Sequence, residues 1–86
     1  MHQVVLYTRE RCSLCEKAKA VLLAVRREVP FDFREVDIGW SGDLYEDYKH
    51  DIPVIEVDGK RAFKYRVDAE ALKERLLEKH GARRKG

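Results

Sequence analysis

The two cysteines of the chain, Cys12 and Cys15, are separated by two residues at a point where a strand-like pattern gives way to a helical one. Val4–Tyr7 is a short β-branched and aromatic run, which is typical of a buried strand. From Ser13 onward, apolar residues recur at helical spacing until Pro30, which would end a helix. The cysteines therefore flank the first turn of a predicted helix that directly follows a strand.

The remaining periodicity predicts five more elements: a strand over residues 31–38, a short acidic helix over 41–50 with Ser41 as N-cap, two strands over 53–65, and a helix capped by Asp68 that ends at Gly81. Asp58-Gly59 is the dipeptide that a type I′ hairpin turn favours. The first two strands need the intervening helix as a crossover if they are to lie parallel. The order βαβαββα thus predicts an α/β fold with a four-stranded mixed sheet flanked by helices.

Length and charge restrict the class of protein. At 86 residues the chain suits one small domain, which we expect to span residues 1–81, with a flexible basic tail over 82–86. A net charge of +2 is too small to give the strongly positive surface of a dedicated nucleic-acid-binding protein. The longest apolar run, residues 20–25, is too short to cross a bilayer. We therefore expect a cytoplasmic protein with neither nucleic acid nor membrane as partner. Abundant Arg, Lys and Glu, with no Asn, follow the compositional trend of heat-adapted proteins.

Two thiols at this spacing can exchange electrons, supply part of a metal site, or fill space. A purely structural disulfide is uncommon in a reducing cytosol, and the loop closed by Cys12 and Cys15 is too short to remove much chain entropy. A four-ligand zinc site is disfavoured because the chain has no second cysteine pair and no H-x3-5-H motif. We therefore predict no metal ligands, and favour a redox role.

The predicted helix start assigns different roles to the two cysteines. Cys12 falls at or next to the N-cap, where free backbone N–H groups and the helix dipole favour a thiolate, and Arg9 and Arg11 add positive charge. Cys12 is thus the expected nucleophile. Cys15, inside the first turn, should be less exposed and is placed to resolve a mixed disulfide.

Three motifs, "CSLC", "DIPVIEVDG" and "FKYRVDAEAL", together with the order of elements, resemble a short bacterial glutaredoxin-like family of the thioredoxin superfamily. The resemblance implies a thioredoxin/glutaredoxin-like fold. It also implies that Pro53 is a cis-proline facing the dithiol, and that the backbone of Ile52 pairs with an incoming thiol substrate as an added strand.

The same resemblance bears on glutathione. Arg9 stands where many glutaredoxins carry a lysine that holds a glutathione carboxylate, and the helix N-terminus at Val67 and Asp68 offers backbone N–H groups. Tyr65 and Arg66, however, replace the glycine pair of those proteins. Because bulky side chains would hinder close approach of the tripeptide, we predict weak glutathione binding and a preference for protein disulfides.

These observations lead to two functional hypotheses. The first is a thiol-disulfide oxidoreductase, a monomer with no bound cofactor, that acts on disulfide-containing proteins and is reset by glutathione, another thiol or a flavoprotein reductase. The second is a non-catalytic binding module, either a dimer bridging an iron–sulfur cluster through Cys12 or a redox-sensing adaptor.

Overall fold

The computed structural model describes residues 1–77 and contains seven elements in the predicted order. Four are strands: β1 (Gln3–Thr8), β2 (Asp32–Asp37), β3 (Val54–Val57) and β4 (Lys60–Lys64). Three are helices: α1 (Ser13–Glu28), α2 (Asp43–Tyr48) and α3 (Ala69–Leu77). The predicted helix end at Gly81, the domain boundary after it and the basic tail lie outside the described residues.

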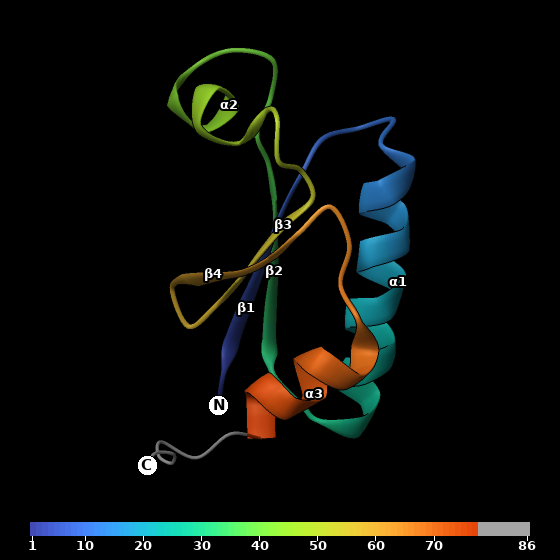
Figure 1. Ribbon diagram of the computed structural model, residues 1–86. Helices are drawn as coiled ribbons and strands as arrows, with labels where there is room; N and C mark the ends of the chain where they lie inside the picture. The colour runs from blue at the N-terminus through green and yellow to red at the C-terminus, as the bar shows by residue number, and fades with distance from the viewer. Residues whose placement is uncertain (78–86) are drawn as a thin grey trace.

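The strands form one mixed sheet in the order β2-β1-β3-β4 (Figure 1). β1 and β2 are parallel, as the helical crossover requires, and β3 runs antiparallel to both β1 and β4. Helices α1 and α3 contact each other on one side of the sheet, while α2 follows the carboxyl end of β2 (Figure 1). The predicted four-stranded mixed α/β fold is confirmed.

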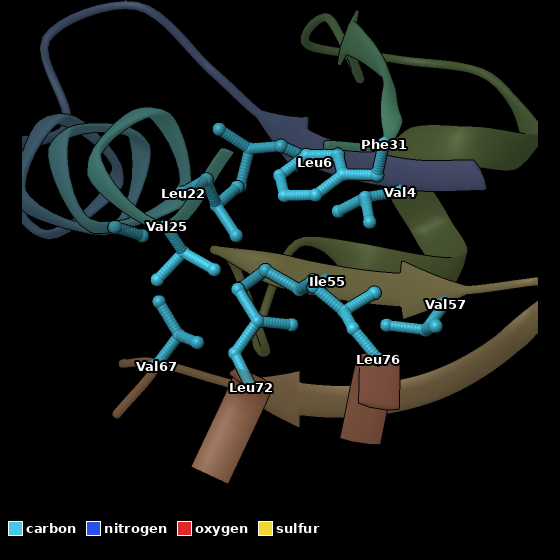
Figure 2. Close-up of a cluster of buried hydrophobic side chains, with 11 residues drawn as sticks. Val4, Leu6, Leu22, Val25, Phe31, Ile55, Val57, Val67, Leu72 and Leu76 are labelled. Carbon is cyan, nitrogen blue, oxygen red and sulfur yellow. The ribbon is translucent and has the colours of Figure 1, made fainter. Parts of the chain in front are cut away.

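The core lies between the sheet and the pair α1 and α3 (Figure 2). Alternate residues of β1, Val4 and Leu6, are fully buried, because successive side chains of a strand point to opposite faces. Leu22 of α1 and Leu72 of α3 are also fully buried against them. Because this cluster joins both helices to the sheet, it fixes where the first turn of each helix lies.

Two local predictions have different outcomes. Asp58 and Gly59 have φ values of 52° and 85°, the pair of left-handed residues that a type I′ turn requires, so the predicted hairpin is confirmed. The prediction of Ser41 as the N-cap of the second helix is wrong. Gly42 occupies that position, because the chain enters α2 with φ 96°, a backbone conformation that favours glycine, and α2 therefore begins without a side-chain cap.

Candidate active site

The two cysteines stand at the start of α1, joined as a disulfide with their Cα atoms 5.2 Å apart. Cys12 is the N-cap with extended backbone, and its Sγ accepts a hydrogen bond from the Cys15 N–H at 3.1 Å. Cys15 is 2% exposed, whereas Cys12 is partly exposed. The structure thus confirms the predicted N-cap and the lower exposure of Cys15. A backbone N–H aimed at the Cys12 sulfur stabilises negative charge there.

Arg9 and Arg11 lie in the segment that connects β1 to α1. Arg11 is exposed and adopts φ 60°. The Arg9 guanidinium stacks over the Trp40 ring, 4.1 Å from its centroid, and lies 5.8 Å from the centroid of Tyr45. The Arg9 side chain therefore packs on Trp40, in the connection between β2 and α2, and Trp40 remains 62% exposed.

A hollow of about 380 Å³ adjoins the β1–α1 connection and is lined by Thr8 and Arg9. The rest of its lining consists of four carboxylate residues, Glu10, Glu16, Glu35 and Asp37. Glu16 directly follows Cys15, so the hollow adjoins the start of α1. Even with Lys19 paired to Glu35 at 3.0 Å and Arg9 in the lining, carboxylates outnumber cations here, which makes this side of the site unfavourable for another anion.

Ile52 and Pro53 lie at the same end of the sheet as the cysteines. The peptide bond between them is cis, and Pro53 is buried. Because Tyr7 pairs with Val54, Pro53 comes next to the carboxyl end of β1, which leads into the Cys12 turn. The Pro53 carbonyl accepts the Tyr65 N–H at 2.8 Å, which ties the β4–α3 connection to this end of β3.

Val67 and Asp68 take two different positions at the start of α3. Val67 is buried at 7% exposure and lines a groove. The Asp68 carboxylate accepts the Ala71 N–H at 2.9 Å, so Asp68 is a helix cap, as its sequence position predicts. Val67 thus forms part of the groove wall, whereas the Asp68 carboxylate is used to cap α3.

The groove itself has a volume of about 300 Å³ and runs between α1 and the β4–α3 connection. Leu14, Lys17, Ala18 and Val21 line it from α1, and residues 65–67 line it from the other side. Leu14 lies in the same first turn of α1 as the cysteines, so the groove begins at that turn, although neither cysteine lines it. Sequence reasoning assigned no binding role to the α1 residues, although their spacing places them on one helix face.

A second feature that sequence reasoning missed is a stacked tyrosine pair on the other side of the sheet. The rings of Tyr7 and Tyr48 have centroids 4.3 Å apart, and their hydroxyls donate to the two carboxylate oxygens of Glu56 at 3.2 and 3.0 Å. Burial, followed by the negative charge of Glu56, raises the pKa of Tyr7 to about 12. The pair connects α2 to β1 and β3, and no local pattern could have revealed this long-range contact.

Two further properties concern metal and membrane. Within residues 1–77, no cluster of three or more His, Cys, Asp or Glu side chains is arranged to hold a metal ion. Over the same residues, no helix combines the length and the apolar character needed to cross a membrane.

Comparison with known proteins places these motifs in a wider group. The model of a family described as "Glutaredoxin-like domain (DUF836)" matches residues 3–77. A glutaredoxin-like protein from Dictyostelium discoideum, named as a YDR286C homolog, is 36% identical over 72 residues, which are 77% of this chain and 67% of that protein.

Solved structures show the same fold. The solution structure of protein Ne2328 from Nitrosomonas europaea has a TM-score of 0.75 at 26% identity and covers 87% of this chain and 91% of its own. Thioredoxin from Fasciola hepatica has a TM-score of 0.56 at 21% identity and covers 87% of this chain and 77% of its own. The arrangement of sheet and helices described above is therefore a thioredoxin fold.

Proposed function

The chain belongs to the family of glutaredoxin-like domains, and on that premise we propose that it is a thiol-disulfide oxidoreductase that reduces protein disulfides through Cys12 and Cys15. One observation carries the proposal. The partly exposed Cys12 caps α1 and its sulfur receives a backbone N–H, while Cys15 is buried three residues behind it. This asymmetry separates an attacking sulfur from a resolving one.

The reaction proceeds in two exchanges. The Cys12 thiolate attacks one sulfur of the substrate disulfide, a Cys12–substrate bond forms, and the other substrate sulfur leaves as a thiolate. The Cys15 sulfur, after losing its proton, then attacks the Cys12 sulfur and displaces the second substrate thiolate. Two electrons pass from the protein to the substrate, and the Cys12–Cys15 disulfide seen in the structure is the oxidised product.

The substrate backbone docks beside Ile52. The strand pairing of β3 begins at Val54, so Ile52 lies before it. The N–H and carbonyl of Ile52 also make no turn or loop hydrogen bond with the backbone of the described residues. An extended substrate segment pairs there as an added strand and brings its disulfide to Cys12. Arg11 is exposed and contributes positive charge near the same turn.

A thiol co-substrate, either glutathione or another low-molecular-weight thiol, or a flavoprotein reductase returns the protein to the dithiol state. The acidic hollow at Arg9 and the Tyr65 side chain, which is 44% exposed, both oppose tight glutathione binding. As part of the same proposal, the protein works as a monomer in the reducing cytoplasm.

Two single substitutions test the assigned roles. Cys12→Ser should abolish reduction of a protein disulfide such as that of insulin, because the attacking sulfur is lost. Cys15→Ser should retain the attack and accumulate a substrate mixed disulfide on Cys12, which mass spectrometry locates. Accumulation through Cys15 in a Cys12→Ser protein would reverse the two roles.

The same preparations test the alternative of an iron–sulfur-bridged module. A protein that remains colourless after anaerobic reconstitution with iron and sulfide, and that reduces disulfides, supports the oxidoreductase. Visible charge-transfer absorbance that is lost in Cys12→Ser, in a dimer without reductase activity, would support the bridging module instead.

A further inference from the structure

Two hollows adjoin the start of α1 and have opposite electrostatic character. The hollow at Arg9 includes four carboxylates, as described above. The groove between α1 and the β4–α3 connection contains two cations, Lys17 and Arg66, and no carboxylate. The net charge of the chain is only +2, yet negative side chains line one hollow and positive side chains line the other. A negatively charged ligand near the dithiol is therefore attracted to the groove and repelled by the acidic hollow.

The two groove cations are not neutralised within the described part of the chain. Lys17 and Arg66 make no ion pair there, whereas Lys19, two residues from Lys17 on the same helix, pairs with Glu35 at 3.0 Å. Both side chains are exposed. Their charge is therefore available to an external anion.

The floor of the groove is apolar. Leu14 is 44% exposed, and Val21 and Val67 line the groove further from the cysteines. An exposed leucine beside a reactive sulfur favours contact with an aliphatic side chain, because that contact removes apolar surface from water. The groove thus combines an apolar floor with a positive rim.

We propose that this groove, lined by Leu14, Lys17, Ala18 and Val21 of α1 and by residues 65–67, is a specificity subsite that binds an acidic, leucine-containing segment flanking the substrate cysteine. The inference rests on the proposed function, since it concerns the same dithiol. The segment's aliphatic side chain lies on Leu14 and Val21, and its carboxylates meet Lys17 and Arg66. The acidic hollow repels the same segment on the other side, so the two hollows together orient the substrate.

A binding experiment tests the groove without using the redox reaction. Two short peptides share one S-methylated cysteine and one leucine and differ only in carrying two glutamates or two lysines after the leucine. Each is titrated into the oxidised, ¹⁵N-labelled protein. We expect the acidic peptide to shift the amide signals of the groove residues, Leu14, Lys17, Ala18, Val21 and residues 65–67, and the basic peptide to leave them unchanged. Equal shifts with both peptides, or none in the groove, would overturn the inference.

A kinetic experiment measures how the groove affects the reaction. The same peptides, with the cysteine activated as a 2-thiopyridyl disulfide, react with the reduced protein, and the rate constant for the acidic peptide is divided by that for the basic one. This ratio cancels changes in intrinsic thiol reactivity. We expect Lys17→Glu and Arg66→Glu each to lower it by about twofold or more, because loss of an exposed ion pair alone accounts for up to about fivefold and the reversed charge also repels the acidic peptide and attracts the basic one. Raising the ionic strength to about 1 M, where the screening length is about 3 Å, should also lower it.

Lys60→Glu is the matched control. It makes the same charge change on an exposed lysine at the hairpin, which lies at the end of β3 away from Pro53, so the ratio should stay as in the unmodified protein. A fall as large as that of Lys17→Glu would show a general charge effect and overturn the subsite. Neutral dithiodipyridine separates the two proposals: a protein that does not react with it fails as an oxidoreductase, while the peptide titration still decides the groove.

Discussion

The helix cap at Asp68 offers a quantitative test of how the site is held in place. Asp68 precedes α3, and its carboxylate accepts the Ala71 N–H at 2.9 Å. Helix α3 packs Leu72 and Leu76 into the core, and Val67 leads from the groove into this helix. Loosening the first turn of α3 therefore affects both the core and the groove wall.

We expect Asp68→Ala to lower the free energy of unfolding by about 1–2 kcal/mol. Loss of an N-cap side chain typically costs about 1 kcal/mol. Loss of a negative charge at a helix N-terminus adds about 0.3–1 kcal/mol. For a domain of this size, each kcal/mol corresponds to a fall of about 4–8 °C in Tm.

The assay is urea denaturation of the oxidised protein, followed by circular dichroism. Asp68→Asn separates the two contributions, because asparagine caps as well as aspartate but carries no charge, so its loss should be only about 0.3–1 kcal/mol. Asp47→Ala, which removes an exposed carboxylate of α2 that makes no hydrogen bond among the described residues, should stay within about 0.5 kcal/mol of the unmodified protein. Equal losses for Asp68→Ala and Asp68→Asn would refute the assigned hydrogen bond.

Four further outcomes are expected. The double variant Tyr65→Gly, Arg66→Gly should be glutathionylated by oxidised glutathione more readily than the unmodified dithiol protein; no gain, together with efficient reaction of the unmodified protein, would show that these side chains do not obstruct glutathione. Ultraviolet titration should find one tyrosine with a pKa near 12, assigned to Tyr7 by its loss in Tyr7→Phe. The hydrogen bond from the Gln3 N–H, followed by that from His2, lowers the pKa of Asp58. The Asp58 carboxylate therefore stabilises the fold above its unfolded-state pKa of about 3.9, and this contribution disappears as pH falls through the lower folded-state pKa. Asp58→Asn should be less stable than the unmodified protein at pH 7 and equally stable below the folded-state pKa of Asp58. Leu72→Ala should lower the free energy of unfolding by about 2–5 kcal/mol in the same urea assay, and a loss below about 1 kcal/mol would contradict its burial in the core.

The features that the sequence predicted correctly are those set by residues close together in the chain. The type I′ turn follows from Asp58-Gly59, because that dipeptide accepts two positive φ values at little cost. The cap at Asp68 follows because its carboxylate reaches an N–H only three residues away. The position of Cys12 at the start of α1 follows from the change of period at Ser13.

Predictions that depended on a weaker local preference, or on the surroundings of a helix, were less accurate. Ser41 is a common N-cap residue, but the backbone enters α2 one residue later through Gly42, where a positive φ determines the start. Leu14 fits the apolar period of α1, yet it is 44% exposed, because the buried face of the first turn is formed by Cys15 and the main core cluster takes in α1 only from Ala18 onward. Periodicity shows which face of a helix is apolar, but it does not show where along the helix the core ends.

The position of Ile52 and Pro53 illustrates what the sequence could not show. The segment from α2 to β3 is short, and Tyr48 at the end of α2 reaches back to stack on Tyr7 and bond Glu56, while the Tyr65 hydroxyl donates to the His50 carbonyl at 3.2 Å. These contacts join residues far apart in the chain, and together they hold the segment between them against the end of the sheet. The backbone at Ile52, where we propose that the substrate pairs, is therefore positioned by long-range contacts of Tyr48 and Tyr65, of which only Tyr65 belongs to a recognised motif, "FKYRVDAEAL". Local patterns cannot detect these contacts, because each tyrosine alone is compatible with a partly exposed surface position.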